Sequence, residues 1–136
     1  MASITVKANV DMLDTVQSFI AREIKTLDCH DKDFMSIEVC VEEIFVNIAS
    51  YAYYPNTGEA IIDCDVDKNT SEVTIVFKDG GTPFNPLEKK DADISPEGLL
   101  GREGGLGIFM VKKMMDFVSY EYKDEKNILL IRKKIC

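Results

Sequence analysis

Glu43 and Asn47 are the first pair of residues in the chain whose types and spacing could do chemistry. They lie four positions apart in the apolar segment "VCVEEIFVNIASYAY", so on a helix they would share one face. At about 100° per residue that face points away from the apolar stripe of the same helix, which places the pair outside the main core. A carboxylate can take a proton from a hydroxyl or from water, and an amide oxygen can be one ligand of Mg²⁺. Two ordinary surface polar residues are the alternative.

The second stretch, "FKDGGTPFNP", follows a predicted strand directly. Gly80 and Gly81 permit a sharp turn and let a flat ligand approach the backbone closely. The carboxylate of Asp79 accepts hydrogen bonds, so it would suit an exocyclic amino group such as that of adenine. An ordinary turn capped by Asp79 is the alternative.

The third stretch, "GREGGLGIFMVKKMMD" at 101–116, places glycines at the start of a predicted helix. The first turn of a helix has free N–H groups and the positive end of the helix dipole, which together attract anions. Gly104, Gly105 and Gly107 carry no side chains that would block phosphate oxygens. The stretch is not a Walker A motif, because no G-K-[ST] follows. A flexible connector is the alternative.

The elements that must position these residues follow from apolar periodicity and turn residues. In order they are a strand at 3–7, a helix with its apolar stripe from Leu13 to Leu27, a helix with its stripe from Phe34 to Ile48, strands at 60–67 and 72–78, a long mobile loop at 86–103, a helix at about 106–116, and strands at 117–123 and 127–134. This order predicts an α+β fold, a two-layer sandwich in which a mixed, mostly antiparallel sheet of about five strands carries three helices on one face. The length predicts a single domain over 1–136.

The composition argues against a nucleic-acid ligand, a membrane span and a zinc site. The net charge of −8 argues against nucleic acid as a direct ligand, because phosphate backbones require a basic surface. No apolar run approaches the ~20 residues of a membrane span, and no signal peptide is evident, so a cytoplasmic protein is expected. The four cysteines form no C-x-x-C pair and there is one histidine, which is not a zinc pattern.

Taken together, the three stretches and their order resemble the GHKL (Bergerat-fold) ATPases, and within them the small anti-sigma-factor serine kinases. "EEIFVNIASYAY" is similar to the N box, "DGGTPFNP" to the first glycine box, and "GREGGLGIFMVKKMMD" to the second glycine box and its helix. The resemblance covers essentially the whole chain, and it implies a histidine-kinase-like ATPase domain with the Bergerat ATP-binding fold.

The resemblance also implies roles for the matching residues. Glu43 would be the catalytic base on a serine hydroxyl, and Asn47 a ligand of the Mg²⁺ that bridges the ATP phosphates. Asp79 would bind the adenine amino group, and Gly81 would make room for the base. Residues 86–103 would be the ATP lid, Arg102 would contact a phosphate, and the phosphate cradle would be formed by Gly104, Gly105 and Gly107. The chain departs from the family at three places. Arg102 lies farther from the glycines than the basic lid residue of the kinases usually does. Tyr51 stands where many relatives carry histidine, and Asn127 stands where relatives often carry threonine.

The function implied by the resemblance is an ATP-dependent protein-serine kinase that is also an anti-sigma factor. Its partners would be an anti-anti-sigma factor phosphorylated on serine, a sigma factor held inactive, and a second copy of the chain in a homodimer. Two alternatives stay open from the sequence. One is an ATP-binding regulatory module that binds partner proteins without phosphoryl transfer, and the other is a detached ATP-binding domain of a larger signalling kinase.

Overall fold

The structure, a computed structural model, describes residues 1–27, 31–88 and 106–135. Its strands are β1 (Ala2–Lys7), β2 (Glu59–Asp67), β3 (Glu72–Asp79), β4 (Phe117–Lys123) and β5 (Lys126–Lys134). Its α-helices are α1 (Leu13–Ile24), α2 (Asp31–Asn47) and α4 (Leu106–Met114). The described residues also form three short helices, which are the 3₁₀-helices η1 (Val10–Met12) and η3 (Pro86–Glu88) and the π-helix η2 (Ile48–Ala52).

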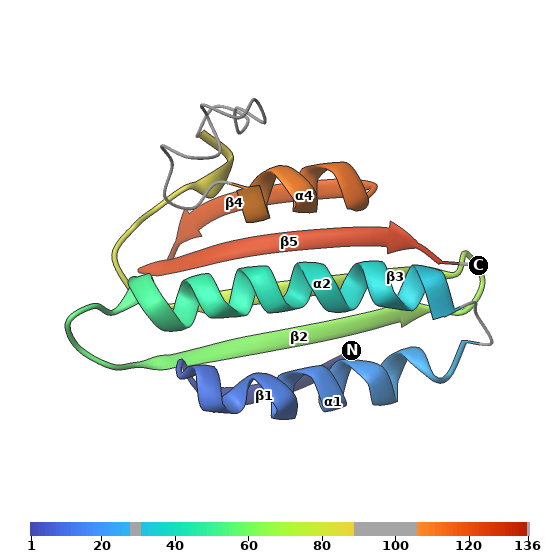
Figure 1. The fold of residues 1–136 in the computed structure, drawn as a ribbon, viewed down its shortest axis with the longest axis horizontal. Helices are drawn as coiled ribbons and strands as arrows, with labels where there is room; N and C mark the ends of the chain where they lie inside the picture. The colour runs from blue at the N-terminus through green and yellow to red at the C-terminus, as the bar shows by residue number, and fades with distance from the viewer. Residues whose placement is uncertain (28–30, 89–105, 136) are drawn as a thin grey trace.

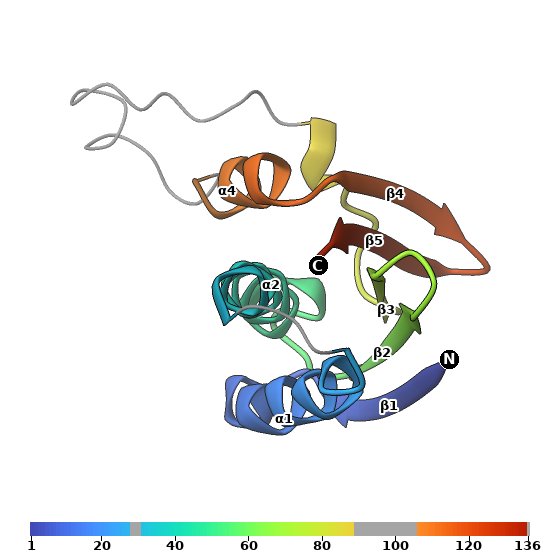
Figure 2. The same ribbon diagram turned by 90° about the vertical axis from the view of Figure 1, so that its right-hand side faces the viewer.

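The five strands form one sheet in the order β1-β2-β3-β5-β4. All four strand pairs are antiparallel, so the described sheet contains none of the parallel pairing that a mixed sheet would have. The three α-helices lie on one face of the sheet (Figure 1 and, edge-on, Figure 2). The predicted two-layer α+β architecture is therefore confirmed. No helix in the described ranges is both long and apolar enough to cross a membrane.

Apolar residues at helical spacing hold α1 and α2 against the sheet. In α1, Val16, Ile20 and Ile24 are four residues apart and buried, so they form one stripe. In α2, Ile37 and Val41 do the same. The start of the first helical segment is capped, since the side chain of Asn9 accepts a hydrogen bond from Asp11 N at 2.8 Å.

The inner face of the sheet changes from apolar to polar at one end. Buried and partly buried residues alternate along β3, and the buried ones are Val73, Ile75, Phe77 and Asp79. In β5 the buried positions are also alternate, and they lie opposite those of β3 in the order Asn127 across from Asp79, Leu129 across from Phe77, and Ile131 across from Ile75. The apolar ladder under the helices therefore ends in a carboxylate facing an amide.

The end of α2 is fastened to the turn that follows β3. The α-helix ends at Asn47, earlier than the apolar stripe predicted, and the chain continues through η2. The carbonyl of Ala52, the last residue of η2, accepts a hydrogen bond from Thr82 N at 2.9 Å. The hydroxyl of Tyr53 accepts one from Gly80 N at 2.7 Å and donates one to Glu59 O at 2.6 Å. Segments almost thirty residues apart along the chain are thus held at fixed positions.

Two cysteines in the core provide a test of this packing. Burial raises the pKa of Cys40 in α2 to about 11 and that of Cys64 in β2 to about 12, so both thiols stay neutral at pH 8. We expect iodoacetamide at pH 8 to leave both unmodified in the native protein and to modify both after denaturation, as quantified by mass spectrometry of the peptides that carry them. Native labelling at the denatured rate at either position would contradict the packing described.

Candidate functional site

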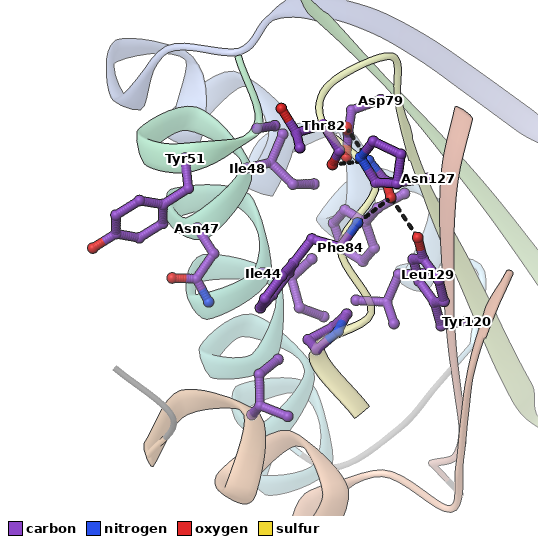
Figure 3. Close-up of a pocket in the computed structure, with 15 residues that line it drawn as sticks. Ile44, Asn47, Ile48, Tyr51, Asp79, Thr82, Phe84, Tyr120, Asn127 and Leu129 are labelled. Atoms are coloured by element: carbon purple, nitrogen blue, oxygen red, sulfur yellow. Dashed lines mark hydrogen bonds between the residues drawn. The ribbon is translucent and has the colours of Figure 1, made fainter. Parts of the chain in front are cut away.

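A pocket of about 510 Å³ lies between the C-terminal half of α2 with η2 and the polar end of the sheet (Figure 3). Its volume is within the range of small-molecule sites. Most of its wall is apolar, and a few polar groups interrupt it, as such sites require. The polar residues that line it are Asn47, Tyr51, Asp79, Thr82, Tyr120 and Asn127, and the apolar ones include Ile44, Ile48, Phe77, Phe84, Ile108 and Leu129.

Asp79 brings a buried carboxylate to this pocket, with 6% of its surface exposed. One oxygen, Oδ1, accepts hydrogen bonds from Gly81 N at 3.0 Å and from Asn127 Nδ2 at 2.9 Å. Within the described part of the chain, no donor to the other oxygen, Oδ2, is found. Because a buried polar atom without a partner is costly, Oδ2 is poised to accept a hydrogen bond from a ligand.

Asn127 also lines the pocket, although it was not among the predicted site residues. Its side chain is buried, and it donates from Nδ2 to Asp79 Oδ1 and, at 3.0 Å, to the carbonyl of Thr82. Its Oδ1 accepts from Phe84 N at 3.1 Å and from the hydroxyl of Tyr120 at 2.5 Å. The amide thus joins the end of β3, the turn after it and β4 (Figure 3). The sequence marked this position as one where relatives often carry threonine, and Asn127 lies two residues before the inward Leu129. Its pairing with Asp79 across the strands could not be predicted from local sequence.

Asn47 and Glu43 lie on α2, partly exposed and outside the core cluster, as their spacing predicted. Asn47 lines the pocket, with Tyr51 one turn further along the same side (Figure 3). Glu43 is one turn earlier, and its carboxyl group packs against the backbone of Gly107 in the first turn of α4. A Cβ atom added to Gly107 would overlap Glu43 Oε2 and lie 2.8 Å from Glu43 Cδ. The structure therefore brings the N-terminal turn of α4 next to the carboxylate predicted to be catalytic.

Gly81 is required by packing against the end of η2. A Cβ atom at Gly81 would overlap the carbonyl oxygen of Ala52 and lie 2.5 Å from its carbonyl carbon. Room for a base at Gly81 stays a prediction beside this observed packing. Arg102, Gly104, Gly105 and residues 89–103 of the predicted lid lie outside the described residues.

The side chains in the described ranges suit a metal ion that takes only one or two ligands from the protein. No cluster of three or more His, Cys, Asp or Glu side chains in those ranges could hold a metal ion. Asn47 supplies one amide oxygen at the pocket wall. Mg²⁺ commonly takes one or two protein ligands and completes its shell with phosphate oxygens and water, so Asn47 fits Mg²⁺ that arrives with a phosphorylated ligand.

Comparisons with known proteins relate this chain to one family. The family described as "Histidine kinase-like ATPase domain" matches residues 6–133. The serine-protein kinase RsbW of Bacillus thuringiensis (strain Al Hakam) is 24% identical over 102 residues, covering 74% of this chain and 64% of that protein. RsbW of Staphylococcus aureus (strain JH9) is 31% identical over 98 residues, covering 68% of this chain and 60% of that protein. The chain thus spans less than two thirds of the length of these relatives.

A solved structure shows the same fold. The crystal structure of the RsbU and RsbW domains of Rv1364c from Mycobacterium tuberculosis superposes with a TM-score of 0.66 at 10% identity. The superposition covers 99% of this chain and 33% of that one. At this identity the likeness concerns the fold alone.

The two glycines of the turn provide a matched test of the packing at η2. Gly81→Ala would press its methyl group against the backbone of Ala52. That backbone cannot move away without breaking the hydrogen bond from Thr82 N to the Ala52 carbonyl. We expect it to lower the free energy of unfolding by about 2 kcal/mol. Gly80→Ala is the control, because the nearest atom to its added Cβ would be the Tyr53 hydroxyl oxygen at 3.5 Å. Equal losses for both variants in urea denaturation would refute the close approach at Gly81.

Proposed function

The chain belongs to the histidine kinase-like ATPase domain family, and from this premise we propose that it is an ATP-dependent protein-serine kinase that also acts as an anti-sigma factor. We take residues 1–136 as one such ATPase domain. The observation that carries the proposal is the position of the Glu43 carboxylate against the first turn of α4. The pocket lined by Asn47 and Asp79 lies next to it. The RsbW relatives carry the name serine-protein kinase, which supports the reaction type.

The adenine base fits the polar end of the pocket. Asp79 Oδ2 would accept a hydrogen bond from the exocyclic amino group. That contact would supply a partner which this buried oxygen does not find among the described residues. The apolar side chains of Ile48 and Phe77 line the same pocket and give a flat ring surfaces to pack against.

The phosphates would extend along α2 toward the N-terminal turn of α4. The amide oxygen of Asn47 would be the protein ligand of Mg²⁺, which neutralises charge on the phosphates when it is bound. The first turn of α4 would present free backbone N–H groups to a phosphate oxygen. Gly107 gives that turn no Cβ atom, and the space which a Cβ would take is occupied in the structure by the carboxylate of Glu43.

Glu43 would act on the incoming hydroxyl group. Its carboxylate lies beside the turn of α4 where the terminal phosphate is expected. A serine hydroxyl brought to that phosphate could give its proton to Glu43 while its oxygen bonds to the terminal phosphorus and the bond from that phosphorus to ADP breaks. Phosphoryl transfer depends mainly on positioning and charge neutralisation, and the two helices supply rigid mountings for both.

The partners in this proposal are an anti-anti-sigma factor that is phosphorylated on serine, a sigma factor that is sequestered, and a second copy of the chain. The net charge of −8 supports a protein partner with basic helices. The position of β1 at an edge of the sheet supports pairing between copies, because an edge strand leaves backbone groups unpaired.

The kinase reaction is tested with labelled ATP, Mg²⁺ and a candidate anti-anti-sigma factor as the acceptor protein. We expect label on an acceptor serine, and Glu43→Gln should lower the rate of labelling at least about 100-fold, because general-base assistance is lost. ATP affinity should stay within about threefold, since Glu43 is not one of the residues that line the pocket.

Glu42→Gln is the matched control for that experiment. Glu42 is exposed and precedes Glu43 by one residue, so it points from a different face of α2. Its labelling rate should equal that of the wild type. Tight ATP binding by the wild type without any labelled serine would replace the kinase with the binding-only regulatory module.

Gly107→Ala separates the position of the Glu43 carboxylate from the stability of the fold. The new methyl group would displace Glu43 Oε2, which is the end of a flexible side chain and can move. Alanine also favours a helix over glycine by about 1 kcal/mol, so stability should not fall. We therefore expect a labelling rate at least about tenfold lower in a protein whose thermal midpoint is unchanged or raised. An unchanged rate would contradict the proposed contact between the catalytic carboxylate and α4.

A further inference from the structure

We infer that Asn127 determines base specificity in the proposed nucleotide site, by occupying one oxygen of Asp79 so that the pocket selects adenine over guanine. The inference rests on the proposed function, since it takes the pocket at Asp79 as the place where a purine base binds. It begins from the observation that Asn127 and Asp79 are opposite one another in the β3–β5 ladder and are both buried.

The orientation of the Asn127 amide is fixed by its surroundings. Two acceptors, Asp79 Oδ1 and the carbonyl of Thr82, lie on one side of it, and two donors, Phe84 N and the hydroxyl of Tyr120, lie on the other. A flipped amide would place its oxygen against both acceptors and its NH₂ group against the backbone N–H donor. Only one orientation satisfies all four hydrogen bonds, so Nδ2 always points at Asp79.

The consequence is that the two oxygens of Asp79 are not equivalent. Oδ1 receives Gly81 N and Asn127 Nδ2, which fills its usual capacity for two hydrogen bonds. Oδ2 is left as the single carboxylate oxygen available to a ligand among the described contacts. The two bonds to Oδ1 also fix the rotation of the carboxylate, because turning it would break both.

A single available oxygen discriminates between purines. The Watson–Crick edge of adenine has one exocyclic amino group, which can donate one hydrogen bond to Oδ2. Guanine has an oxygen at the equivalent ring position, and that oxygen would repel the carboxylate. Guanine binds a carboxylate well when its ring N–H and 2-amino group donate to both oxygens together, as two parallel hydrogen bonds. Asn127 blocks that arrangement because it already holds Oδ1.

The test measures dissociation constants of the full chain for ATP and GTP, each with Mg²⁺, by calorimetry. We expect the wild type to prefer ATP and Asn127→Ala to reduce the ratio of the two constants by about tenfold, because the second oxygen of Asp79 becomes available. Asn127→Val should reduce it in the same direction, because valine has no donor for Asp79 Oδ1. It serves as the second variant if alanine prevents folding, since valine is favoured in strands. If Asn127 served folding alone, its replacement would weaken the binding of ATP and GTP equally, and the ratio of the two dissociation constants would stay unchanged.

Asn85→Ala is the matched control. Asn85 lies in the same turn segment, but its side chain accepts from Leu87 N at 2.9 Å and is not among the pocket residues. Its ATP-to-GTP ratio should equal that of the wild type. An unchanged ratio in both Asn127 variants, or an equal change in Asn85→Ala, would overturn the inference and leave the proposed function intact. Failure of the wild type to bind either nucleotide would overturn both.

Discussion

The register of β3 against β5 is the constraint on which the site depends. It places Asp79 directly across from Asn127 on the face that the helices cover. Since side chains alternate along a strand, a slip of one residue would turn one of the pair to the opposite face and leave the other buried without its partner. The inward apolar residues behind the pair, such as Phe77 and Ile131, resist that slip because it would expose them to water. The hydrophobic ladder therefore holds the polar pair in position.

The helix layer depends on the same end of the sheet. At its C-terminal end, α2 with η2 is fastened to the turn after β3 through the Ala52 carbonyl and the Tyr53 hydroxyl. A π-helix is rare and often marks a functional site, and here it follows directly after Asn47. Because the turn and the helix are fixed to one another, the distance from Asp79 to the residues on α2 is set by rigid elements.

Much of this arrangement was predictable from local patterns. Alternation and helical spacing gave the order of elements, and the four-residue step correctly placed Glu43 and Asn47 outside the core. The apolar stripe to Ile48 predicted one helix and did not show the change from α-helix to π-helix after Asn47, because an apolar residue continues the stripe equally well in either. The glycines were attributed to ligand approach, whereas in the structure Gly81 and Gly107 also make room for other parts of the chain.

The sequence by itself determined which residues can do chemistry and which elements carry them, because side-chain type and periodicity are local properties. It indicated a role for the carboxylate of Asp79 and a shared helical face for Glu43 and Asn47. Only the tertiary structure decided which of these groups meet. The contact between Asn127 and Asp79, and that between Glu43 and Gly107, join residues 48 and 64 positions apart. Such pairings depend on strand register and helix packing, which are settled by burial summed over the whole core.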